Sequence, residues 1–376
     1  MLDELFTEAE RQLNICNSCR YCEGYCAVFP ALERRTLLDT GDITQLANLC
    51  HDCRACFHAC MYAPPHEFAV DPPRILSAVR LASYDRYLPS VRGLQPGWSR
   101  GWPARVAAVV LVGVALLVLV AATEGLGALW RHGRPYQVIP YPALLVVVLL
   151  PTVWSVAVLL RGLALYWREV HGPLRGLADW RALGTALAAA ARLRNMRGGG
   201  EECYPPADDP PLPAGPPPAG PSPARRRLHS AVAGGFTACF AATVAAAFEQ
   251  DILGLAPPYP LLSVPVILGT AGGLSMLAGC AGLTCLRRRS GPATPGAGPG
   301  IADYGLLFGL GLLALTGLLT LLLRATPAFG LILVIHLATI VVCFTIAPYT
   351  RFVHAGYRYL ALVADAIEQR RPRSVG

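Results

Sequence analysis

The sequence contains no lysine, so all 32 of its Lys and Arg residues are arginines. Charge of either sign is scarce, because Asp, Glu, Lys and Arg together make up only 15% of the chain. Hydrophobic residues make up 54%, and the mean hydropathy is +0.44. A typical soluble domain carries more charge and fewer long apolar runs. The composition therefore favours a membrane protein.

Three familiar motifs are also missing. The N-terminus, Met1 to Leu5, has acidic residues where a signal peptide has basic ones, and no apolar run follows, so we expect this region to stay in the cytoplasm. No Cys-x-x-Cys-His occurs, which argues against covalent c-type haem. No strand is followed by Gly-x-Gly-x-x-Gly, so a flavin or nucleotide is expected to belong to a partner.

Eight of the thirteen cysteines lie between Cys16 and Cys60. They form two blocks, 16–30 and 50–64, which align at an offset of 34 residues and share the spacing C-x2-C-x2-C-x3-C. Three cysteines at two-residue gaps can bind three irons of one cube, and the longer gap directs the fourth toward another cluster. We therefore predict two [4Fe–4S] clusters with crossed ligation. The first takes Cys16, Cys19, Cys22 and Cys60, and the second takes Cys50, Cys53, Cys56 and Cys26.

Zinc is the alternative metal for clustered cysteines. It favours pairs of C-x2-C hooks that meet at one tetrahedral site, whereas each block here carries four cysteines. Arg20 and Arg54 occupy equivalent positions in the blocks, where they either offset the negative charge of the clusters or lie in solvent. Because eight cysteines already complete two ligand sets, the neighbouring histidines are expected to be surface or supporting groups: His51, His58 and His66.

Six apolar runs are long enough to cross a bilayer, at roughly 20 residues each. Arginines gather at the ends of these runs that share one side, and Glu249 and Asp251 fall on the other, which is the positive-inside pattern. Both termini and the clusters are therefore expected on the cytoplasmic side of a bacterial inner membrane. The predicted spans are 104–123, 142–165, 230–253, 261–286, 303–323 and 329–350.

The predicted fold is mainly α, with a two-cluster ferredoxin-like domain followed by a six-helix transmembrane bundle. A helical stretch, Leu174 to Met196, and a Gly/Pro-rich linker separate the second and third spans. The predicted divisions are the cluster domain 1–90, the first two spans 91–170, the helix and linker 171–224, the last four spans with the haem-binding histidines 225–360, and a cytoplasmic tail 361–376.

Three histidines lie in or beside the spans, where ionisable residues are costly and often functional. His229 begins the third span and His354 follows the sixth, so both are expected at one depth near the cytoplasmic face. Two imidazoles at one level can bind a b-type haem iron, and we predict one haem held by this pair. The alternative is that each lies at the headgroup interface. His336 is 18 residues before His354, so it is either a separate ligand or a core histidine.

These motifs resemble the tricarballylate, or citrate, utilisation protein B family. The resemblance lies in the doubled cysteine block, in Gly198-Gly199-Gly200 followed by Cys203-Tyr204-Pro205, and in the stretches Arg226 to His229 and His336 to His354. The last stretch is also similar to the haem-bearing helix of the nitrate reductase gamma subunit, where two histidines at similar separation serve two haems. The single early histidine of this chain departs from that pattern.

The resemblance implies a membrane subunit that reoxidises a partner FAD-dependent dehydrogenase, the tricarballylate dehydrogenase, and passes electrons through clusters and haem to quinone. A related arrangement is associated with oxidation in cobalamin ring synthesis, so the partner's substrate stays open. No nucleic-acid partner is expected. One rival hypothesis is a membrane subunit of a heterodisulfide-reductase-like or nitrate-reductase-like complex. Another is a transporter with a metal-binding regulatory domain, although the spans offer almost no acidic residues to bind a substrate.

Overall fold

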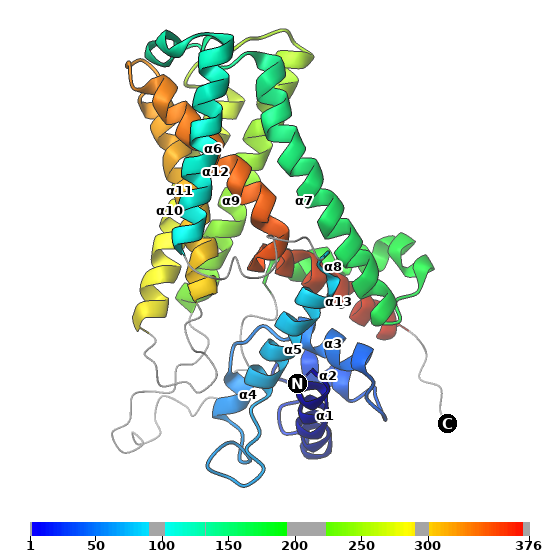
Figure 1. Ribbon diagram of the computed structural model, residues 1–376. Helices are drawn as coiled ribbons and strands as arrows, with labels where there is room; N and C mark the ends of the chain where they lie inside the picture. Colours follow the sequence, from blue (N-terminus) through cyan, green and yellow to red (C-terminus); the bar gives the residue numbers. More distant parts are fainter. Residues whose placement is uncertain (1, 90–101, 132, 194–222, 290–300, 371–376) are drawn as a thin grey trace.

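The computed structural model describes residues 2–89, 102–131, 133–193, 223–289 and 301–370. Within these ranges every regular element is a helix and none is a strand. Six long helices form a bundle, and a smaller helical domain lies at one end of it (Figure 1). The predicted mainly-α fold, with an N-terminal domain and a transmembrane bundle, is confirmed.

The six long helices correspond to the six predicted spans. Each is long and apolar enough to cross a membrane. Their outer surfaces expose large apolar side chains, such as Leu111 (71% exposed) and Leu150 (70% exposed), which water would not tolerate in such numbers. The chain is therefore a multi-pass membrane protein. The helices are α6 Trp102–Thr123, α7 Tyr141–Glu169, α9 Pro223–Asp251, α10 Val264–Arg289, α11 Ile301–Leu322 and α12 Phe329–Ile346.

Glycines set the distance between α9 and α10. A Cβ on Gly235 would lie 2.7 Å from the carbonyl oxygen of Gly272, and a Cβ on Gly272 would lie 2.8 Å from that of Gly235. Ser275 adds a hydrogen bond by donating its hydroxyl to the Ala231 carbonyl at 3.0 Å. Small residues let membrane helices approach closely in this way. The close pair fixes the first turns of α9, which carry His229.

The N-terminal domain is built from five helices with clear end signals. Asp39 caps α3 in a reciprocal capping box with Asp42. Asp71 caps α5 by accepting a hydrogen bond from the Arg74 backbone, and two prolines, Pro72 and Pro73, open the helix. The helices are α1 Leu2–Cys19, α2 Val28–Leu32, α3 Thr40–Leu49, α4 Ala55–His58 and α5 Pro72–Tyr87.

This domain shares its hydrophobic core with later parts of the chain. Tyr166 and Trp167, at the end of α7, are fully buried in it. Tyr357 stacks on Tyr84 of α5, with ring centroids 4.6 Å apart. The cluster domain and the membrane bundle are therefore packed together, and residue 90 does not mark the end of an independent core.

The C-terminal segment departs from the prediction. The prediction of a tail at 361–376 is wrong as far as Glu368, because residues His354–Glu368 form α13, which buries Ala361 to Ala366 against the N-terminal domain. Residues 371–376 lie outside the described ranges. α13 packs against the N-terminal domain because one of its faces is apolar. Its end is also held by ion pairs, of Arg34 with Asp365 and of Arg35 with Glu368.

Shorter elements connect the long helices. The sixth span ends at Ile346, two short 3-10 turns follow around Pro348, and α13 starts in a new direction (Figure 1). The predicted helix between spans two and three is present as a 3-10 turn and α8, whereas the Gly/Pro-rich stretch after it, with Cys203, lies outside the described residues. The connecting elements are η2 Leu126–Trp130, η3 Pro135–Gln137, η4 Leu174–Ala178, α8 Trp180–Ala191, η7 Ala347–Tyr349 and η8 Arg351–Val353.

Candidate metal centres

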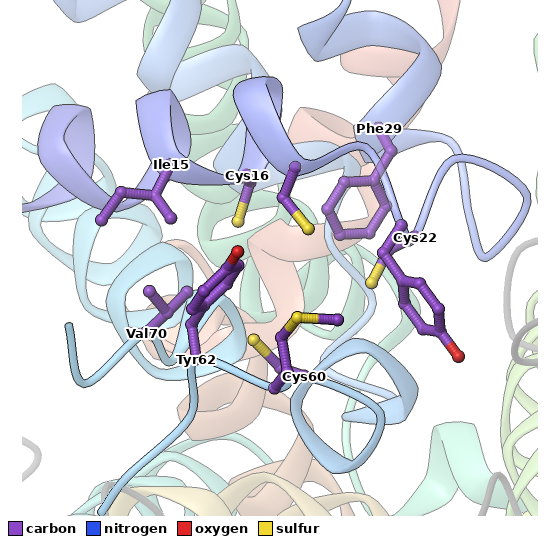
Figure 2. Close-up of a pocket in the computed structure, with 10 residues that line it drawn as sticks. Ile15, Cys16, Cys22, Phe29, Cys60, Tyr62 and Val70 are labelled. Atoms are coloured by element: carbon purple, nitrogen blue, oxygen red, sulfur yellow. The ribbon is translucent and has the colours of Figure 1, made fainter. Parts of the chain in front are cut away.

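The structure brings four of the predicted ligands around one cavity. We call them the first cysteine set: Cys16, Cys19, Cys22 and Cys60. Figure 2 shows Cys16, Cys22 and Cys60 around one space, with Phe29 and Tyr62 at its sides. Cys60 belongs to the second sequence block, so the structure joins the two blocks as the crossed prediction requires.

The remaining four cysteines form a second group, the second cysteine set: Cys26, Cys50, Cys53 and Cys56. Cys26, Cys50 and Cys56 pack in the same hydrophobic core. Burial raises the pKa of Cys26 and of Cys56, and the charges of other cysteines, Cys50 and Cys53 among them, raise both further. Cys26 comes from the first sequence block. Cys22 also acts on Cys56, so the two sets adjoin.

The internal repeat extends to the backbone. Arg20 and Arg54, one residue after the second cysteine of each block, both adopt the left-handed conformation, with φ of 55° and 64°. A positive φ is unusual for arginine and turns the chain sharply. In each block this turn lies between the second cysteine and the third. No signal in the sequence indicated these turns, because no glycine stands at either position.

The chemistry of the donors fits iron–sulfur clusters better than zinc. Within the described residues, no three His, Cys, Asp or Glu side chains converge closely enough to hold a single metal ion. Four thiols line the first cavity, which matches the number of cysteine ligands of a [4Fe–4S] cluster. Burial, together with the nearby cysteines, raises the pKa of Cys16 to about 12. Such thiols stay protonated unless bound iron displaces the proton, which is the usual coupling between metal binding and deprotonation.

His229 and His354 meet where the bundle joins the cluster domain. Their ring centroids are 6.1 Å apart, and the rings are nearly perpendicular, at 82°. Two imidazoles that bind one iron from opposite sides, with metal–nitrogen bonds of about 2 Å, place their centroids roughly 6 Å apart. The separation therefore fits a shared iron.

The ring nitrogens of this pair are suited to ligation. His354 donates its Nδ1 hydrogen to the Arg351 carbonyl, which leaves Nε2 available. Burial, and then the charge of Arg358, lowers the pKa of His354 to about 3, so its imidazole is neutral. His229 has a buried Nδ1 with no hydrogen-bond partner among the described residues. The residues present thus fit one haem iron.

His336 does not join this pair. It lies between α11 and α12, with Nδ1 2.9 Å from the hydroxyl oxygen of Thr316. A Cβ on Gly317 would lie 3.1 Å from the His336 ring, so the imidazole packs directly on the backbone of α11. Both contacts fit a core histidine of the bundle.

The three histidines near the cysteines differ in their surroundings. His51 follows Cys50 and is partly buried, with Nδ1 2.8 Å from the Leu49 carbonyl. Burial also lowers the pKa of His51 well below its usual value. His58 is partly exposed at the end of α4. His66 accepts a hydrogen bond from the Phe68 backbone and packs against Tyr62.

Two functional candidates escaped the sequence analysis. Arg80 and Arg358 both donate to the carbonyl oxygen of Cys50, at 2.5 and 2.6 Å. Arg358 had the appearance of a topology signal after the last span. The signal for Arg80 was its position on the apolar face of α5, one turn after the buried Leu76.

Comparison with known proteins agrees with this arrangement. The family model described as "Citrate utilization protein B" matches residues 106–375, and the "Citrate utilization protein B Fer4-like domain" matches residues 9–86. The chain belongs to the citrate utilization protein B family. The "Citrate utilization protein B" of Escherichia coli is similar along its length, with 36% identity over 383 residues that cover 100% of this chain and 96% of the relative. No solved protein structure matches this chain.

Membership confirms the family predicted from the sequence motifs. The Fer4-like match, 9–86, includes all eight cysteines of the two sets. It supports iron–sulfur clusters as the cofactors of this domain and electron transfer as its role.

Proposed function

We propose that this chain carries electrons from a partner FAD-dependent dehydrogenase to membrane quinone, with two [4Fe–4S] clusters and one b-type haem as carriers. The matched family is described as "Citrate utilization protein B", and the partner that we propose is a dehydrogenase of the tricarballylate dehydrogenase kind, which the resemblance of the sequence implies. The observation that carries the proposal is the convergence of the first cysteine set on one cavity, while both helices that bear His229 and His354 contact the loop of Cys50 and Cys53.

The residues divide this task between them. Iron–sulfur clusters and haem supply one-electron carriers between a two-electron flavin and a quinone. The cysteine sets would hold the clusters in a domain whose surface is open to a soluble partner. His229 and His354 would hold the haem iron at the end of the bundle, within reach of a lipid-soluble acceptor. His336, bound to Thr316, has no place in this path.

The haem is tested by the dithionite-reduced minus oxidised visible spectrum of protein purified anaerobically in detergent. We expect sharp b-type bands that disappear in His229→Ala and His354→Ala. His336→Ala is the matched control, since it removes a buried imidazole of the bundle and should keep the bands. Iron–sulfur bleaching without haem bands would refute the haem. Loss of the bands in His336→Ala alone would refute the assignment of the ligands.

The acceptor is tested with the reduced protein in proteoliposomes. Anaerobic addition of a quinone should reoxidise clusters and haem together, as followed by their visible absorption. Cys16→Ser, which removes one ligand of the first cysteine set, should slow reduction of the haem by the partner dehydrogenase and leave reoxidation by quinone unchanged. Clusters that stay reduced after quinone addition would contradict a quinone as acceptor.

We also propose that the clusters face the cytoplasm of a bacterial inner membrane. The start of α9, with Arg225 to Arg227, and the end of α10, with Arg287 and Arg288, both lie at the cluster-domain end of the bundle. Positive charge marks the cytoplasmic side of membrane proteins. Protease added to sealed, right-side-out spheroplasts should leave α1 to α5 intact, whereas cleavage there would place the clusters outside.

A further inference from the structure

The Cys50 carbonyl is held by two arginines from different parts of the chain. Arg80 comes from α5 and is buried, and it also donates to the Ala47 carbonyl at 3.2 Å. Arg358 comes from α13 and also donates to the Asn48 carbonyl at 3.3 Å. Two positively charged groups thus converge on the backbone of one predicted ligand of the second cysteine set.

Neither Arg80 nor Arg358 forms an ion pair within the part of the chain that the structure describes. Among the described residues, no carboxylate lies within ion-pair distance of Arg80 or Arg358, and their hydrogen bonds go to carbonyl and hydroxyl oxygens. Asp52, which lies in the same loop, pairs with Arg54 at 3.4 Å. Burying a cation without a counter-charge is costly. A thiolate-bound cluster on the second cysteine set, with its net negative charge, would supply that counter-charge.

The first cysteine set has different surroundings. Arg20, the arginine within its sequence block, is exposed and donates to the Asn17 carbonyl at 3.1 Å. The cavity is lined only by residues of the N-terminal domain, and two of them are largely exposed, Tyr21 at 56% and Met61 at 62%. Water screens charges at such a site, whereas buried charges act strongly. The two sets therefore differ both in burial and in nearby positive charge.

The second cysteine set is also the one that faces the histidine pair. Arg358 lies one helical turn after His354 on α13, and it reaches Cys50 directly. Arg225, four residues before His229 on α9, donates to the Asp52 carbonyl at 3.4 Å. Both histidine-bearing helices thus contact the loop that carries Cys50 and Cys53.

We propose, building on the proposed function, that Arg80 and Arg358 hold the reduction potential of a cluster on the second cysteine set above that of a cluster on the first. A nearby positive charge stabilises the reduced, more negative form of a cluster and so raises its potential. Electrons from the partner's reduced flavin would then enter at the exposed first set and move to the second. Each transfer oxidises the cluster on the first set by one electron and reduces the cluster on the second by one. Arg80 and Arg358 take part in this transfer only through the effect of their positive charge on the potential of the second-set cluster.

The test is a redox titration of the detergent-purified protein followed by electron paramagnetic resonance. Cys16→Ser and Cys56→Ser identify the signal that belongs to each set. Arg358→Gln and Arg80→Gln remove the charge but keep hydrogen-bond donors, and Arg358→Lys keeps the charge. Arg74→Gln is the matched control, because Arg74 lies on the same helix as Arg80 but is exposed. The measurement needs neither quinone nor partner, so it is independent of whether the proposed acceptor is right.

We expect both Gln variants to lower the potential of the second-set cluster alone. At the potential where the first-set cluster is half reduced, the ratio of reduced to oxidised second-set cluster should fall at least tenfold relative to wild type. A tenfold change corresponds to about 59 mV for one electron. Arg358→Lys and Arg74→Gln should stay near the wild-type value. His229→Ala, which would lack haem, should show the same shift when combined with Arg358→Gln.

Two results would overturn the proposal. One is an equal shift of both cluster potentials in the Gln variants, and the other is no shift in either. If Arg358→Gln fails to assemble the second cluster, Arg80→Gln decides in the same way, and an unshifted potential in that variant overturns the proposal.

Discussion

Arg35 holds α13 against the cluster domain, and its replacement by methionine tests that contact. Its side chain is only 8% exposed and pairs with Asp42 at 2.7 Å and with Glu368 at 3.0 Å. It also donates to the Gln45 side chain at 2.9 Å. Glu368 is at the end of α13, so this single arginine joins α3 to the C-terminal helix.

The cost of Arg35→Met follows from what the substitution leaves behind. Removing one partner of a buried ion pair costs roughly 3–5 kcal/mol when the other charge stays buried. Here Asp42 and Glu368 are 24% and 26% exposed and can recover some hydration. Glu368 also keeps its hydrogen bond from Gln45. We therefore expect α13 to undock more easily by about 2–3 kcal/mol.

Amide hydrogen exchange measures this opening directly. Because each 1.4 kcal/mol is tenfold in an equilibrium constant, exchange in α13 and α3 should quicken roughly 30- to 140-fold, provided that closing is faster than exchange. Arg11→Met is the control, since Arg11 and Glu8 form an exposed pair, at 44% and 41%, and such pairs contribute little. If exchange in α13 is no faster in Arg35→Met than in Arg11→Met, the assigned role of Arg35 is wrong.

Two further predictions concern the bundle and the clusters. Gly235→Ala should cost about 1–3 kcal/mol through overpacking against the Gly272 backbone, and it should lower the temperature at which the protein loses its haem bands. Gly234→Ala is the control, because its added methyl group meets open space, and it should leave that temperature unchanged. Equal midpoint temperatures in the two variants would contradict the close packing of α9 and α10. Removal of iron by a chelator should speed tryptic cleavage in α1 to α5, because the two sets of thiols lose the metal that holds them together, while cleavage in the bundle should be unchanged. Equal cleavage of apo and iron-loaded protein would show that the domain does not need its clusters to fold.

Local sequence patterns predicted the elements that depend on local chemistry. The last span, predicted at 329–350, is the helix Phe329–Ile346 followed by the turn at Pro348. A long apolar run in a bilayer forms an α-helix, because its backbone N–H and C=O groups must be paired within the segment. Likewise, the two-residue gaps between cysteines limit which thiols can meet, and Cys16, Cys19, Cys22 and Cys60 all line one cavity; their ligation of a cluster stays a prediction.

Long-range contacts were beyond such patterns. Arg34 and Asp365 are 331 residues apart in sequence, and Arg35 and Glu368 are 333 apart. The sequence around residue 361 does not indicate which part of the chain packs against the apolar face of α13, so the segment was predicted to be a tail. Arg358 was missed for the same reason. An arginine after a span usually marks topology, and only the fold shows that this one reaches Cys50.

Crossed ligation is tested most directly by electron paramagnetic resonance of single cysteine variants in the reduced state. Cys56 and Cys60 lie in the same sequence block, yet they belong to different sets in the structure. Cys60→Ser should therefore alter the same cluster signal as Cys16→Ser and leave the other signal intact, whereas Cys56→Ser should alter the other one. If Cys60→Ser and Cys56→Ser alter one and the same signal, each block binds its own metal, and the path proposed here from the first set to the second does not exist.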